Sequence, residues 1–390
     1  MRRELESLLA QDVEPLKRRS AELFDQLRAP GAPLVLVGAG GLGRKTLAVL
    51  ARKGVQVSAL ADNSAQLHGT RVHDLEVLSV KEAAQRYGTS AVFIVTVFVG
   101  SESVRRQLRD LGCRTVLPFY PLFWKYADDL LPHYVFDLPH KVIEAAPAVL
   151  QAWSLLADDA SRVEYLANVR WRLDPEFKDL PPPAAHEIYF PPDVFALEQD
   201  EFFVDCGGFD GDTLSSFLKR TPAGTCDAVV FEPDPANFSK LEAFARALPP
   251  DVTSRIELRC AAIGAHPSVL RLESGNSTAS SLSSSGEIEV PCLTIDEVLG
   301  DRAATFIKMD IEGAEPEAIE GAAKQIRRNR PLLALSAYHS QDHLWRLPLL
   351  VHSLDPDYRY FLRHYAAEPV DALVAYAVPA RRVLQPGRSA

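Results

Sequence analysis

The sequence predicts an α/β protein with two parallel sheets, a smaller Rossmann-like sheet near the N-terminus and a larger sheet in the second half. Three observations lead to this fold class. Apolar runs of strand length alternate with helical patterns in both halves of the chain. Each half opens with a strand-like run that ends in a glycine turn, at "LVLVGAGGLGRK" and at "FFVDCGGFDGDT". The last two apolar runs, 358–365 and 371–378, lie too close together for a helical crossover and are expected to be antiparallel.

The size and composition of the chain fit two soluble domains. It has 390 residues, of which 47% are hydrophobic and 24% are charged. The formal net charge of −10 disfavours nucleic acid and anionic membranes as partners. No apolar run has the length of a membrane span, the N-terminus lacks the apolar core of a signal peptide, and the five cysteines are scattered. We therefore expect a cytoplasmic protein with no membrane span, and the sequence leaves oligomerisation open.

The N-terminal domain is expected to span residues 1–125. It begins with one helix over residues 1–28, where Leu5, Leu8 and Leu9 recur at helical spacing. Helical segments then alternate with four strands, which are "PLVLVG", "VQVSALAD", "AVFIVTVF" and "RTVLPF". This alternation is half of a doubly wound sheet.

A helical connector over residues 126–185 is expected to join this domain to a second domain at 186–390. The second domain should contain five parallel strands, which are "FFVDC", "DAVVFEP", "RIELRC", "TFIKMD" and "PLLALSA". An extra β pair is expected between the third and fourth of these strands, in "VLRLE" and "EIEVPC". It flanks a serine-rich loop, residues 274–285, that is interpreted either as a lid or as a surface linker.

The first glycine turn is typical of nucleotide binding. Gly38, Gly40 and Gly43 fit the G-x-G-x-x-G pattern, which allows a tight turn and places a helix N-terminus against an anion. Two basic residues follow the turn, as suits a phosphate. Asp62 ends the next strand, where an acid would bond the hydroxyl groups of a ribose. The alternative is a turn that keeps this shape without a ligand.

The second glycine turn carries acids where the first carries bases. Carboxylates would repel a pyrophosphate and favour a cation, such as the amino group and sulfonium of S-adenosylmethionine (SAM). Glu232 ends the next strand and can accept hydrogen bonds from both ribose hydroxyls, and the chain at Pro233 can border the adenine. Alternatively, an acid or threonine of the turn simply caps the following helix. The candidate ligand-binding residues of the turn itself are Asp205, Gly207, Gly208, Asp210, Gly211 and Thr213.

Several motifs of the second domain together resemble the FkbM family of SAM-dependent methyltransferases. They are "FFVDCGGFDGDT", "FEPDPANFSKL", "CAAIG", "FIKMDIEGAEPEAIEGA" and "YHSQDHLWRLPLL", spread over residues 186–378. The resemblance implies a class I methyltransferase fold and O-methylation of a hydroxyl on a sugar, glycan or related natural product. It further implies a methionine site at Asp205, Gly207 and Gly211, a methyl-donor site at Asp310, a ribose contact at Glu232 and an adenine site at Ala262 and Ile263.

The first domain resembles, more weakly, a small Rossmann-like domain that occurs beside sugar-modifying enzymes. The motifs that carry this resemblance are "VGAGGLGRK" and "ALADN". In those enzymes the domain is associated with nucleotide-sugar binding, so the resemblance implies that a nucleotide-linked sugar is a possible partner of the first turn.

Methyl transfer to a hydroxyl needs a group that removes or polarises its proton. Three candidates lie at or just beyond the carboxyl ends of strands of the second domain: His339, Asp310 and Lys308. His339 is interpreted as a base, because imidazole titrates near neutrality, or alternatively as a structural histidine. Lys308 could polarise an acceptor oxygen, although a salt bridge to Asp310 or Glu312 is the simpler interpretation.

The same region also offers a set of divalent-metal ligands. Oxygen-rich clusters bind magnesium in some methyltransferases of other families. The acids of "DIEGAE" could instead satisfy a helix N-terminus. The candidate metal ligands are Asp310, Glu312, Glu315 and His339.

Two other functions compete with methyl transfer. The first turn could serve an NAD-dependent oxidoreductase, but no tyrosine–lysine or histidine–acid arrangement follows it, and "KMDIEGAE" would be unexplained. A non-catalytic nucleotide-sugar-binding protein could keep a methyltransferase-like shell. The intact acids Asp205, Glu232 and Asp310 argue against that reading.

Overall fold

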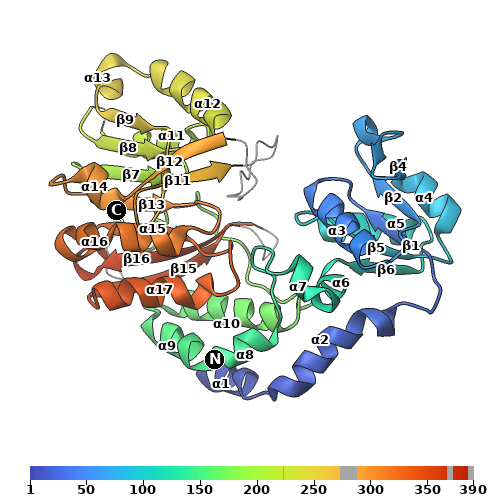
Figure 1. The fold of residues 1–390 in the computed structure, drawn as a ribbon. Coiled ribbons are helices and arrows are strands. Elements are labelled where there is room, and N and C mark those ends of the chain that lie inside the picture. Colours follow the sequence, from blue (N-terminus) through green and yellow to red (C-terminus); the bar gives the residue numbers. More distant parts are fainter. Residues whose placement is uncertain (223, 273–287, 367–371, 385–390) are drawn as a thin grey trace. The chain divides into compact units, whose positions relative to one another are not determined.

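The computed structural model describes residues 1–222, 224–272, 288–366 and 372–384. The chain divides into two compact units (Figure 1). The N-terminal unit comprises Glu6–Ala146 and Val169–Phe177, and the C-terminal unit comprises Met1–Leu5, Pro147–Asn168 and Lys178–Ala390. The stretch predicted as a connector, 126–185, is shared between the two units, and its role as a separate segment stays a prediction.

The N-terminal unit is built on a six-stranded sheet in the order β3-β4-β2-β1-β5-β6. All neighbouring strands are parallel except β3 and β4. From β1 the chain continues to β2 on one side and later to β5 on the other, so the carboxyl end of β1 is a switch point of the kind that binds ligands. The strands are β1 (Leu34–Val37), β2 (Ala59–Asp62), β3 (Arg71–Val72), β4 (Leu75–Ser79), β5 (Val92–Val95) and β6 (Thr115–Pro118).

The four predicted strands of this unit are present, but the structure differs from the prediction in two places. Strands β3 and β4 were not predicted, because they are short and their side chains are partly exposed, so they lack an apolar run. The single helix expected over residues 1–28 is two helices, α1 (Arg2–Leu9) and α2 (Val13–Leu27). Asp12 starts the second helix by accepting a hydrogen bond from the backbone N–H of Glu14.

Helices connect the strands of the N-terminal unit and continue beyond its last strand. The helix that follows the first glycine turn is α3 (Gly41–Arg52). The others in this part of the chain are α4 (Val80–Tyr87), α5 (Ser101–Asp110), α6 (Tyr120–Lys125), α7 (Ala127–Leu130), α8 (His140–Glu144), α9 (Ala146–Leu155) and α10 (Asp159–Leu173).

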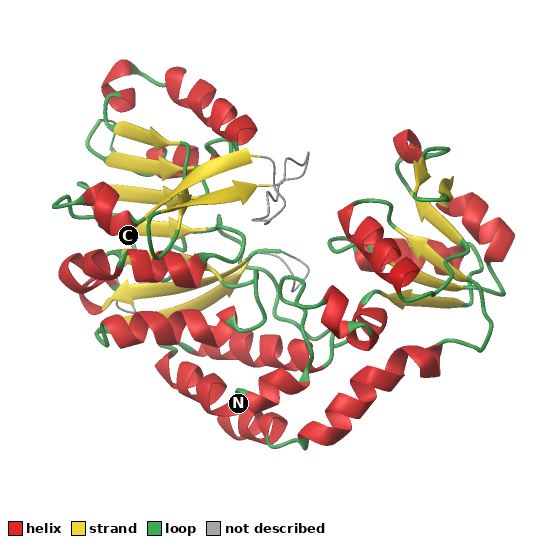
Figure 2. Ribbon diagram, in the orientation of Figure 1, coloured by secondary structure: helices red, strands yellow, loops and turns green. Residues whose placement is uncertain are grey.

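The C-terminal unit is built on a seven-stranded sheet in the order β15-β16-β14-β13-β7-β8-β9 (Figures 1 and 2). Five strands are parallel, and β16 is antiparallel to both of its neighbours, β14 and β15. This confirms the predicted parallel sheet closed by an antiparallel hairpin. The strands are β7 (Phe202–Cys206), β8 (Asp227–Phe231), β9 (Ile256–Arg259), β13 (Phe306–Met309), β14 (Leu332–Ser336), β15 (Tyr358–His364) and β16 (Leu373–Pro379).

A second, three-stranded sheet lies between β9 and β13 along the chain. Its strands are β10 (Ala262–Ile263), β11 (Ser268–Leu272) and β12 (Ile288–Leu293), in the order β10-β12-β11. The pairing of β11 with β12 is antiparallel, so the predicted extra β pair is confirmed. The serine-rich loop interpreted as a lid, residues 274–285, lies outside the described residues.

Apolar side chains from strands and helices form the core on one face of the seven-stranded sheet. Phe203, Val230 and Phe306 on the strands pack in one cluster with Leu214 and Phe217 of the first helix after the glycine turn. The helices of this unit are α11 (Asp212–Leu218), α12 (Pro235–Arg246), α13 (Pro250–Thr253), α14 (Ile295–Leu299), α15 (Glu315–Gly321), α16 (Ala323–Asn329) and α17 (His343–Leu354).

Residues well before the glycine turn also hold the sheet together at its edge strand β15. Arg363 of β15 lies 2.6 Å from Asp158 Oδ2 and 2.7 Å from Asp193 Oδ2 through its Nη2. Nδ1 of His364 lies 3.0 Å from Oε2 of Glu164 on α10. These two buried side chains are therefore bonded by acids that precede the first strand of their sheet in the chain.

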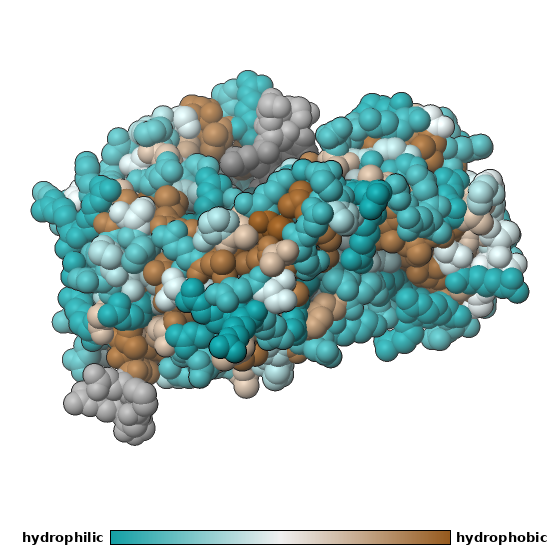
Figure 3. Space-filling model, turned by 90° about the horizontal axis from the view of Figure 1, so that it is seen from below, coloured by the Kyte–Doolittle hydropathy of each residue, from teal (hydrophilic) through white to brown (hydrophobic). Residues whose placement is uncertain are grey.

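No helix in the described part of the chain is both long and apolar enough to cross a bilayer. The face of the molecule drawn in Figure 3 is mainly hydrophilic, with hydrophobic residues in patches between the hydrophilic ones.

Candidate functional site

The carboxyl ends of the parallel strands bring most of the predicted site residues of the C-terminal unit to one edge of the sheet. In the strand register, Cys206 is paired with Phe231 of β8 and with Met309 of β13. The residues that follow these strand ends are Gly207, Glu232 and Asp310, and His339 follows β14. Segments far apart in the sequence thus meet where ligands bind in open α/β sheets.

Gly207 lets the turn after β7 pass directly below the end of β13. Its φ angle is +88°, and a Cβ placed there would lie 2.0 Å from the carbonyl oxygen of Asp310. No residue with a side chain fits this position without moving one of the two strand ends. The remaining glycines, Gly208 and Gly211, complete the turn, and Gly211 precedes the first residue of α11.

Asp205 and Lys308 form a buried ion pair beneath this turn. The two side chains are 0% and 2% exposed, and Nζ of Lys308 lies 3.0 Å from Oδ1 of Asp205. Nζ donates a hydrogen bond to the carbonyl of Gly207 at 2.6 Å, whereas neither oxygen of Asp205 accepts a well-aligned hydrogen bond from the described residues. The partner of Lys308 is therefore Asp205, and not Asp310 or Glu312 as the sequence suggested.

The charge state of this pair follows from its burial. Burial raises the pKa of Asp205 to about 6, against the opposing attraction of Lys308. Burial also acts to lower the pKa of Lys308, but the charges of Asp205 and Asp310 outweigh it and leave that pKa raised. At neutral pH both members of the pair are therefore charged, and the carboxylate of Asp205 can still accept hydrogen bonds.

The other acids of the turn are on the surface. Asp210 and Asp212 are exposed, and Oδ1 of Asp212 accepts a hydrogen bond from the backbone N–H of Thr213 at 2.5 Å. Thr213 is buried at the start of α11. The negative charge predicted for the turn is present, but only one of its three carboxylates lies inside the fold.

Glu232 joins the glycine turn to the next strand end. Its Oε2 accepts the backbone N–H of Phe209 at 2.8 Å, and its Oε1 accepts that of Asp234 at 2.9 Å. The side chain is buried, and burial raises its pKa, which these two backbone hydrogen bonds partly oppose. Each carboxylate oxygen still has one lone pair for a ligand hydroxyl.

The residues predicted to border an adenine lie on neighbouring segments. Pro233 follows Glu232 and is half-buried, and Sγ of Cys260, after β9, lies 4.0 Å from its carbonyl oxygen. Ala262 and Ile263 form the short strand β10 and are 8% and 3% exposed. Their contact with a ligand stays a prediction.

Two tyrosines hold the carboxylate of Asp310. Tyr189 Oη donates to Oδ2 at 2.7 Å, and Tyr338 Oη donates to Oδ1 at 3.0 Å. Burial acts to raise the pKa of Asp310, but Lys308, His339 and the hydrogen bond from Tyr189 outweigh it, so the pKa is lowered. The side chain of Asp310 remains 27% exposed and can be reached from solvent.

His339 lies among three carboxylates. Its Nδ1 is 2.8 Å from Oε1 of Glu315, and its Nε2 is 3.4 Å from Oδ1 of Asp310 and 3.9 Å from Oε2 of Glu312. Burial acts to lower the pKa of His339, but the charge of Glu315 and its hydrogen bond, with Asp310 and Glu312, raise it to about 9. The ring is therefore protonated at neutral pH, and must release that proton before it can act as a base.

The four predicted metal ligands do lie together. Asp310, Glu315 and His339 each offer a ligand atom within 4.8 Å of the others, and Glu312 lies beside them. Glu315 also has His343 Nδ1 3.4 Å from its Oε2, so this buried acid lies between two imidazoles. The arrangement fits a divalent cation and fits a charge-balanced cluster of protein groups equally well.

Sequence reasoning missed Tyr189 and Tyr338 as site residues. Tyr189 stands in a proline-rich stretch before the first strand of the sheet, where no strand end marks it as a site residue. Tyr338 immediately precedes His339 and had the same signal, a polar side chain just beyond the fifth parallel strand. That position alone could have identified Tyr338, whereas Tyr189 has no comparable signal.

The first glycine turn, in the N-terminal unit, is built in a similar way with different charges. A Cβ on Gly43 would lie 1.7 Å from the carbonyl oxygen of Gly38, so α3 packs directly against the end of β1. Asp62 accepts the backbone N–H groups of Ala39 and Ser64, both at 2.7 Å. Gly40 ends the turn as the residue before α3, and Arg44 and Lys45 are exposed on that helix. Ligand binding here stays a prediction.

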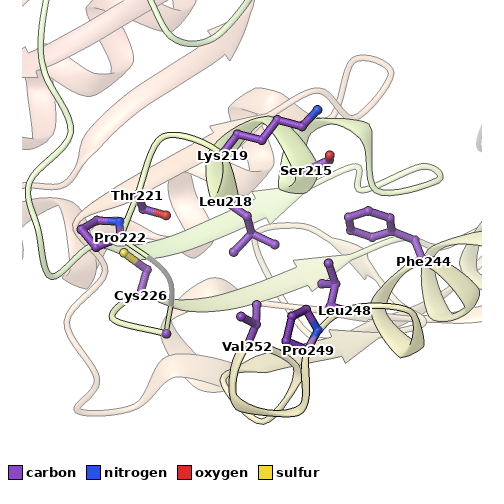
Figure 4. A pocket seen from close by; sticks show the side chains of 11 residues that line it. Ser215, Leu218, Lys219, Thr221, Pro222, Cys226, Phe244, Leu248, Pro249 and Val252 are labelled. Atoms are coloured by element: carbon purple, nitrogen blue, oxygen red, sulfur yellow. The ribbon is translucent and has the colours of Figure 1, made fainter.

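A separate cavity of about 250 Å³ lies between α11, α12 and α13 (Figure 4). Leu218, Phe244 and Leu248 line it, together with residues of the loop that leads into β8. None of the predicted site residues lines this cavity.

Comparison with known protein families gives a match within the C-terminal unit. Residues 205–368 match the family model of the methyltransferase FkbM domain. Among solved structures, the chain is similar to the crystal structure of methyltransferase FkbM from Methylobacillus flagellatus KT, with a TM-score of 0.72 and 24% identity. That match covers 96% of this chain and 97% of the other, and it confirms the predicted fold class.

Other likenesses are weaker and cover less of the chain. A putative rRNA methylase from Clostridium thermocellum has a TM-score of 0.33 at 6% identity, over 50% of this chain and 91% of the other. Fibrillarin from Aeropyrum pernix, in complex with natively bound SAM, has a TM-score of 0.30 at 12% identity, over 46% of this chain and 67% of the other. No curated protein sequence matches the chain significantly.

Proposed function

Because residues 205–368 match the family model of the methyltransferase FkbM domain, we propose that the protein transfers the methyl group of SAM to a hydroxyl of a sugar, glycan or related natural product. The observation that carries the proposal is the pair of buried acids at adjacent strand ends, Asp205 and Glu232. A cation and a ribose are what such a pair binds best beside a glycine turn.

The proposed cofactor site uses the residues in order along the strand ends. The amino group of SAM supplies the positive charge that faces Asp205, whose oxygens accept no well-aligned hydrogen bond from the described residues. The ribose hydroxyls donate to the free lone pairs of Glu232, and the adenine lies along Pro233, Ala262 and Ile263. When bound, SAM supplies a methyl group that is activated by the positive charge of the sulfonium. The sulfur leaves as a neutral thioether, which needs no protonation.

In this proposal, Asp310 and His339 serve the acceptor. The partly exposed carboxylate of Asp310 accepts a hydrogen bond from the acceptor hydroxyl and orients its oxygen toward the methyl group. His339, once deprotonated, takes the proton as the new O–C bond forms. Lys308 acts indirectly, because its ammonium group is committed to Asp205 and to the carbonyl of Gly207.

Calorimetry and a transfer assay test this function. We expect SAM and S-adenosylhomocysteine (SAH) to bind to the full chain, and NAD not to compete with them. Methyl-labelled SAM should then pass its label to at least one member of a panel of free and nucleotide-linked sugars. Tight NAD binding without a response to SAM would favour an oxidoreductase, and binding of nucleotide sugars alone would favour a non-catalytic binding protein.

The role proposed for His339 separates catalysis from cofactor binding. His339→Ala should lower turnover about 100-fold, which is typical of a lost general base, and should leave the Kd of SAH within about twofold. Turnover equal to that of the wild type would remove His339 from the mechanism.

Metal dependence is tested on the same active preparation. If Asp310, Glu312, Glu315 and His339 hold a divalent ion, a chelator should abolish turnover and added Mg²⁺ or Mn²⁺ should restore it. Full activity in the chelator would mean that the cluster works with protein groups alone.

A further inference from the structure

Tyr189 is held in an unusual backbone conformation next to the site. Its φ angle is +69°, which is uncommon for a residue other than glycine, and the residue is 4% exposed. The backbone N–H of Tyr189 donates to Oη of Tyr376 at 3.1 Å, and that hydroxyl lies 2.6 Å from Oη of Tyr365. The main chain at Tyr189 is thus bonded to the hairpin β15–β16 through Tyr376 of β16.

The side chain of Tyr189 points at the charged groups of the site. Its hydroxyl donates to Oδ2 of Asp310 at 2.7 Å, and Nζ of Lys308 lies 5.3 Å from the centre of its ring. Since Tyr338 donates to the other oxygen, both ends of the Asp310 carboxylate are held by phenols.

We infer that Tyr189 is a positioning residue of the methyl-transfer site, which fixes the Asp310 carboxylate in the orientation that faces the transferred methyl group. This inference rests on the proposed function. The Asp310 carboxylate is 27% exposed, and electrostatic stabilisation depends on groups that are already oriented before the reaction. Tyr189 precedes the residues matched by the family model, so its hydroxyl comes from the segment before the matched domain.

The test needs no acceptor, because two SAM analogues report on the methyl position. SAH lacks the methyl group, whereas sinefungin carries a charged amino group in its place. In the wild type, sinefungin should bind more tightly than SAH, because its ammonium group faces Asp310. Tyr189→Phe keeps the ring and removes only the hydroxyl. We expect it to reduce the preference for sinefungin over SAH by about tenfold, while the Kd of SAH changes less than twofold.

Matched variants separate positioning from structural support. Tyr338→Phe removes the second donor to Asp310 and should reduce the same preference. Tyr358→Phe removes a buried hydroxyl that bonds the carbonyl of Pro331 and not Asp310, and should leave both Kd values unchanged. Asp310→Asn should abolish the preference for sinefungin over SAH, and it therefore sets the upper limit for the effect of the tyrosine variants.

The outcomes of these binding measurements distinguish the positioning role of Tyr189 from the proposed function. An unchanged preference in Tyr189→Phe, or an equal loss of affinity for both analogues, would overturn the positioning role while the proposed function stands. A wild-type protein that binds neither analogue would overturn the proposed function itself, and the inference with it.

Discussion

The two glycine turns of this protein share a backbone plan and differ in the charges around it. Each follows a central strand at a switch point, and in each a glycine leaves no room for a side chain against a neighbouring carbonyl, at Gly43 and at Gly207. In the N-terminal unit, the acid Asp62 is half-buried and bonded to two backbone N–H groups, and bases follow the turn. In the C-terminal unit, the acid Asp205 is fully buried and pairs with Lys308.

The comparison teaches that the backbone of such a turn does not select its ligand. The features that select the ligand are the sign of the nearby charges and the number of carboxylate lone pairs, on the acid beside the turn, that accept no hydrogen bond from the protein. The family match falls on the acidic turn and not on the basic one. The following predictions test how far this division between the two turns holds.

The largest difference should appear in stability. Lys308→Met leaves the charge of Asp205 buried without a partner, which costs about 3–5 kcal/mol of folding free energy. Lys45→Met beside the first turn changes an exposed residue and should cost within about 0.5 kcal/mol. Denaturant unfolding monitored by circular dichroism measures both, and similar losses for the two variants would show that the burial contrast between the turns has no energetic meaning.

The next difference concerns cofactor affinity. Glu232→Ala should weaken SAH binding about 100-fold, or ~2.7 kcal/mol, because it removes the ribose acceptor and frees the backbone N–H groups that the side chain bonds. Asp62→Ala makes the equivalent change at the first turn and should leave the Kd of SAH unchanged. Calorimetry on both variants measures the contrast, and a loss of SAH affinity in Asp62→Ala alone would reverse the assignment of the two turns.

A pH dependence should follow from Asp205. Its pKa is about 6, above the ordinary value, so the carboxylate is ionised at pH 7 and takes up a proton as the pH falls through 6. The neutral acid no longer attracts the amino group of the ligand, so SAH affinity should fall about tenfold between pH 7 and pH 5. Calorimetry across this range should show the decline, and in Asp205→Asn the decline should disappear. A pH-independent Kd in the wild type would mean that Asp205 does not face the ligand charge.

The smallest expected effect is at the first turn. With uridine diphosphate glucose as the probe, Asp62→Ala should weaken binding about fivefold, the size of one or two exposed hydrogen bonds. Glu232→Ala should leave that Kd unchanged, as the matched control in the other unit. Absence of binding to the wild-type protein would mean that the first turn keeps its shape without this ligand.

Much of the fold could be predicted, because the features that specify it are local. Buried parallel strands appear as apolar runs, and the short gap before 371–378 fixed the direction of the last hairpin. Strands β3 and β4 escaped detection because half-exposed strands of two and five residues carry little apolar pattern. The break before α2 depended on a single capping residue, Asp12, within a stretch of continuous helical periodicity.

The site could be predicted only as far as strand ends could be located. The position of a residue after a parallel strand placed Asp205, Glu232, Asp310 and His339 at one edge. The partner of Lys308 and the protonation of His339 depend on distances between segments, which no local pattern contains. Tyr189 reaches the site from a segment whose backbone has a positive φ angle and bonds Tyr376 of the hairpin, and nothing in its neighbourhood of the sequence indicates either feature.

The acids that bond Arg363 and His364 have a practical consequence for anyone who shortens this protein. Asp158 and Glu164 precede the boundary at residue 186 that the sequence suggested. A recombinant fragment that starts there would keep both side chains in the sheet but lose these two acids, with Asp193 left as the partner of Arg363, so we expect it to aggregate on expression. A fragment that starts at residue 147 would retain the contacts of Asp158 and Glu164 with β15. The soluble yields of the two fragments would show how much these contacts stabilise the fold.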